Sequence, residues 1–387
     1  MKRKPIDGLR EWQSDPTVTG VNRLPQRATF YPHESQDEAK RNSFLSGGRT
    51  MSLNGAWQFL LCDDIAAKPQ HFYEITAETD GWSEIAVPSS WQMQGFGQAA
   101  YCNVQYPWEG VEKLQPPFAP TQSNSVGLYR KTVTIDENFL LDRLILTFEG
   151  VESCFYLYVN GERVGYSEGT FRRSEFDVTD LVHPGENLIA AEVYRWCTGS
   201  WLEDQDFFRL AGIFRDVYLT ARPAQYLADV AVSAEPDARY RDGLLRAKVT
   251  LFCDDIPAEV EMTVFDGSGA TVAFDSVAVQ QSDAADLRAT IPFVRLWSAE
   301  SPYLYTVLIL LRSENGEVLE CTSVRTGFRR IEIKDSVVYL NDRRLLLKGV
   351  NRHEFSCDTG RAIDRETMRA DLITMKRNNI NAVRTSH

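Results

Sequence analysis

Acidic side chains cluster between aromatic rings in one short stretch, Trp201-Leu202-Glu203-Asp204-Gln205-Asp206-Phe207-Phe208. Carboxylates accept hydrogen bonds from hydroxyl groups, and aromatic faces stack on the apolar C–H face of a pyranose. A binding pocket needs only a few such polar groups among apolar ones. The stretch therefore indicates a sugar site. The alternative at this point is an acidic surface loop beside a few core aromatics.

Composition limits the class of protein. The 387 residues predict two to three domains, and 43% hydrophobic residues with 11% aromatics suffice for packed cores. A net charge of -12 argues against a nucleic-acid or anionic-membrane partner. No apolar run approaches the roughly 20 residues of a membrane span. The basic start, Met1 to Pro5, has no apolar segment after it, so we expect no signal peptide.

The seven cysteines stand singly in the sequence. Their number is odd and they form no CxxC pair, so neither a structural zinc site nor a disulfide framework is expected. The simplest location for such a chain is the reducing cytoplasm.

The sequence divides into four predicted parts. Residues 1–49 are polar and irregular, and we expect an extended arm that lies on another part of the chain. Residues 50–222 predict a β-sandwich or a jelly roll, and residues 223–328 an immunoglobulin-like β-sandwich that acts as a spacer. Residues 329–387 predict the opening of an α/β fold, for example a (β/α)8 barrel.

Alternation and turn signals support the β-sandwich prediction. Leu144, Leu146 and Phe148 alternate with other residues, as expected for a strand. Asn160-Gly161 stands between two such runs and predicts a tight hairpin. Further predicted strands span residues 128–135, 188–194 and 216–221.

A different pattern begins after residue 329. An apolar strand over 345–350 precedes Asp364, a plausible helix cap, and then Met368, Leu372 and Met375 recur on one helical face. A second strand follows over 380–385. Strand, helix and parallel strand open an α/β fold. Residues 329–387 make up under a quarter of the roughly 250 residues of a (β/α)8 barrel, so the chain end at His387 looks like a truncation.

This arrangement would gather four polar side chains. His353 and Glu354 follow the first barrel strand, whereas Arg384 and His387 lie at the end of the second. Active sites of (β/α)8 barrels lie at the carboxyl ends of the strands. The alternative for each residue is a structural role at a strand end.

Ordered motifs along the chain resemble glycoside hydrolase family 2, in particular its large bacterial β-galactosidases. The motifs are Glu11-Trp12 with Val18 to Leu24, Ser52 to Trp57, Val87 to Gly95, Tyr101 to Pro107, Gly199 to Asp206, Gly212 to Val217, Leu296 to Ser298, Gly349 to Glu354 and Asn381 to Arg384. The resemblance implies a jelly-roll sugar-binding domain, an immunoglobulin-like domain and a catalytic barrel. It implies hydrolysis of terminal β-D-galactosides such as lactose, with retention of configuration.

The resemblance also implies roles for single residues. Asp206 would contact the galactosyl group and a sodium ion, and Asn103 would hydrogen-bond the galactose. His353 and His387 would stabilise the transition state, while Arg384 would support the catalytic carboxylates.

The two catalytic glutamates of the family lie on later barrel strands, beyond His387, as do the magnesium ligands and the remaining sodium ligands. We therefore expect the 387 residues alone to be an inactive fragment. Other readings remain: a non-catalytic carbohydrate-binding subunit that completes a partner chain with the rest of the barrel, or another family 2 glycosidase such as a β-glucuronidase. The resemblance further implies a homo-oligomeric parent protein.

Overall fold

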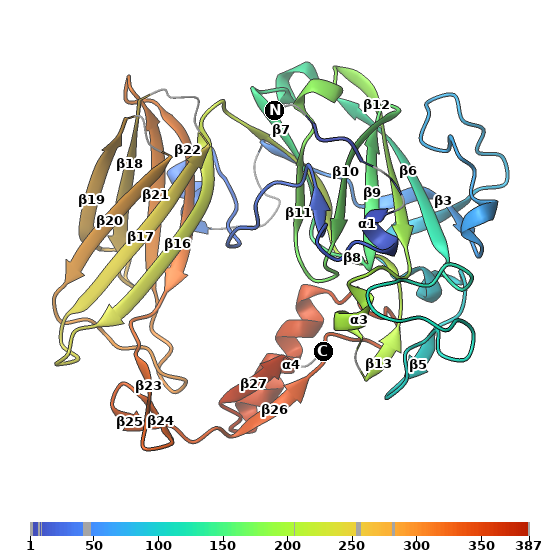
Figure 1. The fold of residues 1–387 in the computed structure, drawn as a ribbon. Helices are drawn as coiled ribbons and strands as arrows, with labels where there is room; N and C mark the ends of the chain where they lie inside the picture. The colour runs from blue at the N-terminus through green and yellow to red at the C-terminus, as the bar shows by residue number, and fades with distance from the viewer. Residues whose placement is uncertain are drawn as a thin grey trace.

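The computed structural model describes residues 3–6, 8, 10–41, 48–204, 206–252, 257–280 and 283–385. The fold is mainly β. Two β-sandwiches stand side by side, and a small α/β part follows the second sandwich and returns to the lower end of the first (Figure 1). The predicted fold class is confirmed: a jelly-roll-type sandwich, an immunoglobulin-like sandwich and a strand-helix-strand unit that forms no closed barrel.

Two antiparallel sheets form the first sandwich. In spatial order, the larger contains β1 (Gly20–Val21), β10 (Glu162–Glu168), β9 (Cys154–Val159), β12 (Gly185–Tyr194), β6 (Val126–Ile135), β3 (Gly55–Cys62) and β4 (Ser83–Val87). The smaller contains β11 (Ser174–Asp177), β7 (Arg143–Phe148), β15 (Val217–Arg222) and β2 (Thr50–Ser52). Short ribbons pair β5 (Ala100–Cys102) with β13 (Phe207–Arg209), and β8 (Val151–Glu152) with β14 (Gly212–Ile213). Short helices are α3 (Ser200–Glu203), η1 (Ile65–Ala67), η2 (Trp91–Gln94), η3 (Glu137–Phe139) and η4 (Thr179–Leu181).

The core of this sandwich explains why its strands form. Leu146 and Phe148 on β7 face Phe155 and Leu157 on β9 across the sheets, and all four are buried. The predicted hairpin is confirmed: Asn160 and Gly161 join β9 to β10, with φ of 50° and 86°. Both residue types tolerate this left-handed backbone, which a tight hairpin turn requires.

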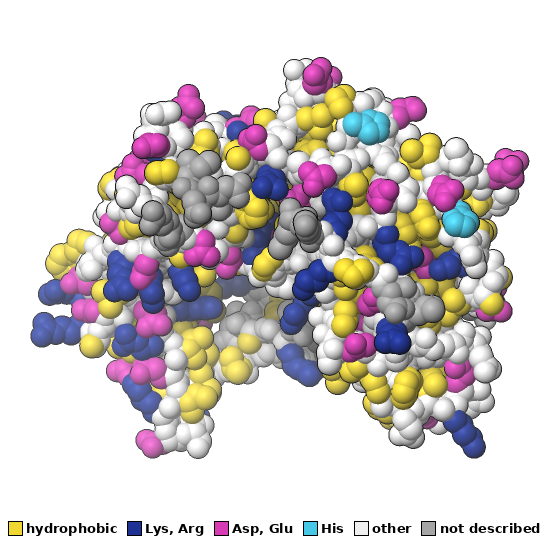
Figure 2. Space-filling view, turned by 45° about the horizontal axis from the view of Figure 1, so that its top comes forward, with side chains coloured by type: hydrophobic (Ala, Val, Ile, Leu, Met, Phe, Trp, Pro, Cys, Tyr) yellow, Lys and Arg dark blue, Asp and Glu magenta, His cyan; other side chains and the backbone are white. Residues whose placement is uncertain are grey.

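The second sandwich packs a sheet of β16 (Tyr226–Pro236), β17 (Gly243–Phe252) and β20 (Ala284–Ile291) on another of β19 (Thr271–Val279), β18 (Ala258–Phe265), β21 (Tyr305–Ser313) and β22 (Val318–Thr326). Buried residues alternate with more exposed ones along β17 and β18, as one-sided sheets require. On the face drawn in Figure 2, acidic and basic side chains are interspersed, and a hollow separates the two lobes.

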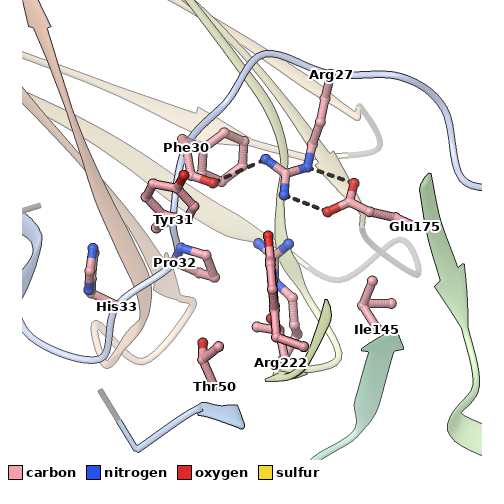
Figure 3. A pocket seen from close by; sticks show the side chains of 11 residues that line it. Arg27, Phe30, Tyr31, Pro32, His33, Thr50, Ile145, Glu175 and Arg222 are labelled. Carbon is pink, nitrogen blue, oxygen red and sulfur yellow. Dashed lines mark hydrogen bonds and ion pairs between the residues drawn. The ribbon is translucent and has the colours of Figure 1, made fainter. Parts of the chain in front are cut away.

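The N-terminal segment ties the two sandwiches together. It includes α1 (Arg10–Gln13), strand β1 in the larger jelly-roll sheet, and α2 (Gln36–Arg41), which packs near β21 and β22. Arg27 forms two hydrogen bonds with Glu175 of β11, of 2.9 and 2.6 Å, while Phe30 enters the core of the second sandwich (Figure 3). His33 exchanges backbone hydrogen bonds with Cys321 of β22.

The α/β part begins with a three-stranded sheet of β23 (Ile331–Lys334), β24 (Val337–Leu340) and β25 (Arg343–Arg344). Strand β26 (Gly349–Arg352), helix α4 (Arg365–Arg377) and strand β27 (Ala382–Thr385) follow, and β26 pairs with β27 in parallel. The Asp364 side chain accepts a hydrogen bond from the Thr367 amide and caps α4, as predicted. Among the described residues, no helix is long and apolar enough to cross a membrane.

Candidate functional site

The β5–β13 ribbon brings together two of the predicted sugar-binding residues. Cys102 pairs with Phe207 in antiparallel register, so Asn103 and Asp206 each stand one residue beyond the last pair at the same end of the ribbon. Both side chains are exposed. The ribbon therefore presents an amide and a carboxylate together at its tip, where both can bond to hydroxyl groups.

Tyr101 fixes the Asp206 carboxylate. Its hydroxyl donates a 2.5 Å hydrogen bond to Asp206 Oδ1, and this bond raises the pKa of Tyr101. The Tyr101 ring also lies 5.6 Å from that of Phe208, and both rings are about half exposed. A carboxyl group beside exposed ring faces is an arrangement suited to a sugar.

The other two carboxylates of the stretch have partners inside the protein. Glu203 accepts hydrogen bonds from the Thr170 amide (2.9 Å) and hydroxyl (2.7 Å), and Asp204 lies 2.5 Å from Arg209 Nη2. Burial raises the pKa of both carboxyls, although Thr170 and Arg209, respectively, oppose the shift. These two residues shape the ribbon, which leaves Asp206 as the exposed carboxylate of the three.

Trp201 also serves packing. Its ring meets Tyr106 edge-on at 4.5 Å and Trp108 at 5.0 Å, and its indole nitrogen donates to the Phe118 carbonyl. The stretch thus contains a packed acidic turn at Trp201 to Asp204 and an exposed tip at Asp206.

The parallel strands β26 and β27 carry the second group of predicted residues. Arg384 pairs in register with Asn351, and His353 follows the last residue of β26. Arg352 reaches Asp371 of α4 at 2.9 Å. Because side chains alternate along a strand, Asn351 and Arg384 face away from α4. His387 lies outside the described residues.

A loop after β26 joins the two groups, and its contact with the jelly roll was not predicted from the sequence. Residues 353–361, named here the docking loop, begin with His353 and press onto the jelly roll. The Phe355 ring stacks on Phe208 at 4.9 Å with an interplanar angle of 10°. Glu354 lies 3.1 Å from Arg215 Nη2. The local sequence signal for this turn is Gly360, because glycine is common in tight turns. In the structure its φ is positive, as such a turn requires.

Arg361 ends the docking loop inside the jelly roll. Its side chain is 3% exposed, and Nε lies 2.9 Å from Glu152 Oε2. The two atoms are not aligned as a directed hydrogen bond, so the contact is an ion pair. Burial raises the pKa of Glu152 to about 7, and Arg361 opposes the rise. Neither residue reaches solvent or the ribbon tip, so their role is structural support.

A cleft of about 630 Å³ lies beside this contact, between the jelly roll and the start of α4. Its walls include Glu149, Arg215, Glu354 and Met368, but not Asn103, Asp206, His353 or Arg384. The cleft and the predicted sugar contacts are therefore separate features.

Metal ligands are sparse in the part of the chain that the structure describes. There, no group of three or more histidine, cysteine, aspartate or glutamate side chains could hold a metal ion. Asp206 is an exposed oxygen donor and fits a hard cation as one ligand among several.

Three sequence profiles of one enzyme family match consecutive parts of the chain. They are "Glycosyl hydrolases family 2, sugar binding domain" over residues 50–223, "Glycosyl hydrolases family 2" over 225–329, and "Glycosyl hydrolases family 2, TIM barrel domain" over 331–387. The chain belongs to glycosyl hydrolase family 2. The profile named for the sugar-binding domain includes Asn103 and Asp206.

Curated relatives of this family 2 chain align over nearly all of it. A β-galactosidase of Priestia megaterium is 41% identical, over 99% of this chain and 38% of the relative. A β-galactosidase large subunit of Leuconostoc lactis is 38% identical, over 97% of this chain and 61% of the relative. The chain thus spans about two fifths of the first relative and three fifths of the second.

Solved structures share the fold. A β-glucuronidase of Bifidobacterium dentium, in complex with coumarin-3-O-glucuronide, superposes with a TM-score of 0.72 at 23% identity, over 88% of this chain and 58% of that one. A Bacteroides uniformis β-glucuronidase gives 0.71 at 21% identity, over 88% and 39%. At these identities the likeness concerns the fold alone.

Proposed function

We propose that this chain forms the galactosyl-binding part of a β-galactosidase that hydrolyses terminal β-D-galactosides with retention of configuration. The observation that carries the proposal is the ribbon tip, where Asn103 and Asp206 stand together in register. Relatives at about 40% identity that are named β-galactosidases support the choice of substrate class.

Each site residue has a role in this proposal. Asn103 and Asp206 bond to galactose hydroxyls, and His353 and His387 donate hydrogen bonds that strengthen as the oxocarbenium-like transition state forms. Arg384 faces the side of β27 away from α4, where it supports the catalytic carboxylates electrostatically.

Two metal ions belong to the proposal. Asp206 supplies one carboxylate to a sodium ion, whose charge would help to hold a galactose hydroxyl. Asp206 fits this role because Tyr101 orients the carboxylate through Oδ1 alone. Magnesium would be held by residues outside this chain.

The proton-transfer pair is not among residues 1–387 in this proposal. A retaining glycosidase needs two carboxyl groups about 5 Å apart on either side of the scissile bond. Glu203 accepts a hydrogen bond from Thr170. Asp204 forms an ion pair with Arg209, and Glu354 forms one with Arg215. We therefore propose that these residues alone do not hydrolyse galactosides.

The missing pair would lie in sequence outside residues 1–387, because this chain covers only 61% of two relatives that are named large subunits. Two relatives of this chain are named large subunits, which supports assembly from more than one kind of chain. We further propose that the assembly contains more than one copy of this chain and lies in the cytoplasm, where the buried thiols of Cys154 and Cys197 would stay reduced.

A chimera tests the proposal. Residues 1–387 replace the aligned segment of the Priestia megaterium β-galactosidase, and turnover of chromogenic β-galactoside and β-glucuronide is compared. We expect turnover of the galactoside, and a loss of roughly 100-fold or more in kcat/KM for Asp206→Asn, because hydrogen bonds formed in the transition state are removed. Asp80→Asn is the matched control, since Asp80 is an exposed aspartate between η1 and β4 of the jelly roll. Preference for the glucuronide, or equal activity of Asp206→Asn, would overturn the assignment.

A further inference from the structure

The docking loop holds onto the jelly roll through contacts of several kinds. Ser356 and Gly360 exchange backbone hydrogen bonds of 2.8 and 2.9 Å, which close the loop into a compact turn. Gly360 has a φ of +63°, and a Cβ there would lie 2.8 Å from Leu210 Cδ1 and 2.9 Å from Met93 Cγ. The turn is therefore fitted closely to the jelly-roll surface.

Arg361 contacts three residues of the jelly roll from this turn. It forms the ion pair with Glu152 of β8, and Nη2 donates a 3.3 Å hydrogen bond to the Phe208 carbonyl. Its guanidinium also lies 3.9 Å from the centre of the Phe207 ring. Arginine suits this place because one planar group serves an ion pair, a carbonyl and a ring at once.

These contacts end within a few residues of both groups of proposed sugar contacts. Phe207 and Phe208 directly follow Asp206, and Phe355 lies two residues after His353. Elsewhere the α/β part is packed less closely against other parts of the chain, since Leu346, Leu347 and Leu372 are more than half exposed. The relative position of Asp206 and His353 thus depends on the docking loop.

We propose that Arg361 is a positioning residue, which holds the loop that carries His353 against the strand that carries Asp206. The Arg361 side chain does so by bridging the Glu152 carboxylate and the Phe208 carbonyl. The importance of this position for catalysis rests on the proposed function, whereas the geometric role of Arg361 does not. Side chains that act on one sugar must be held within a fraction of an ångström, so a loose loop would disconnect the two groups.

A distance measurement between spin labels tests this role in the 387-residue chain. One label is attached to Cys357, an exposed cysteine of the docking loop, and the other to Val104→Cys at the ribbon tip, with Cys102 and Cys253 replaced by serine. The intact chain is expected to give one narrow distance distribution, and Arg361→Ala a broad one. Millimolar methylguanidinium is expected to narrow the Arg361→Ala distribution again, because it fills the vacated site beside Glu152.

Matched variants separate positioning from general stability. Arg365→Ala removes an exposed arginine four residues away and is expected to leave the distribution narrow. Glu152→Gln removes the charge that pairs with Arg361 and changes the side-chain shape little, so we expect it to broaden the distance distribution. This variant replaces Arg361→Ala in the test if Arg361→Ala does not fold. A narrow distribution in both Arg361→Ala and Glu152→Gln, or a lower unfolding midpoint without any broadening, would overturn the proposal.

Sugar binding is read separately, on unlabelled chains, by saturation-transfer NMR with methyl β-D-galactoside. Weaker binding by Arg361→Ala, together with broadening, would support the positioning role for the sugar site. Broadening in a chain whose wild type binds no galactoside would retain the geometric role of Arg361 and count against the proposed function. Equal binding by wild type and Arg361→Ala would show that the position of the loop does not matter to the sugar.

Discussion

Glu203, Asp204 and Asp206 lie close together in the sequence, but each carboxylate has a different partner. Thr170 and Arg209 hold the first two inside the fold, whereas Asp206 stays exposed beside Tyr101. The sequence located this acidic stretch, but it could not separate the three roles. The partners Thr170 and Tyr101 lie 33 and 105 residues away in the sequence from the carboxylates they contact. Only the tertiary fold brings these residues together.

Glu168 is an interior acidic residue whose carboxylate is also held by partners within the protein. Its carboxylate accepts hydrogen bonds from the Tyr166 hydroxyl (2.5 Å) and the Thr198 hydroxyl (3.0 Å). Burial raises its pKa from 4.5 to about 7, although these hydrogen bonds oppose the rise. Between these two pH values the folded protein holds a proton at Glu168 that the unfolded chain has released.

This difference predicts a stability that falls as the pH rises. The contribution of Glu168 to the free energy of unfolding is greatest below about pH 4.5 and is lost as the pH passes through about 7. The loss is on the order of 3 kcal/mol. In Glu168→Gln the side chain cannot ionise, so we expect urea unfolding at pH 5 and pH 8 to show a smaller decrease than in the wild type. Glu162→Gln, an exposed site on the same strand, is the control. Equal decreases in the wild type and Glu168→Gln would contradict the prediction.

Local sequence patterns predicted individual helices, strands and turns correctly, and they also predicted the parallel pairing of β26 with β27. Asn160-Gly161 fixed one hairpin because its backbone conformation depends on those two residues. Asp364 and the apolar period after it likewise predicted α4. The pairing of β5 with β13, and the docking of Phe355 on Phe208, have no local signal. The site therefore depends on contacts that the sequence alone could not reveal.

The elements of the α/β part leave apolar side chains uncovered. Leu372 on α4 is 54% exposed, Leu347 before β26 is 66% exposed, and Val383 on β27 is also exposed. A strand-helix-strand unit without a closed barrel leaves such faces uncovered. Exposed apolar faces and unpaired strand edges promote association between chains.

We accordingly predict that the 387-residue chain associates as its concentration rises, and that Leu372→Lys reduces this association. Sedimentation velocity over a range of concentrations measures the effect. Ile75→Lys is the control, because Ile75 is 64% exposed but lies on the jelly-roll part. A wild-type chain that stays monomeric throughout, or an equal effect of both substitutions, would show that this face does not drive association.

In the whole molecule, the jelly-roll sandwich holds the β5–β13 ribbon beside the docking loop of the α/β part. The N-terminal segment joins the two sandwiches through Arg27 and Phe30, and the docking loop joins the jelly roll to β26. Composition and strand spacing predicted the mainly β class and the α/β ending. The contacts that hold the parts together involve single residues at the junctions, which composition and spacing cannot detect.

We propose that this chain carries galactosyl contacts but no proton-transfer pair. Hydrolysis of a chromogenic β-D-galactoside by the purified 387-residue chain, with sodium and magnesium present, tests it most directly. We predict no turnover above that of a heat-denatured sample. Turnover that copurifies with the chain and disappears in Asp206→Ala or Glu354→Ala would contradict the account, because a working carboxylate pair would then lie within these residues.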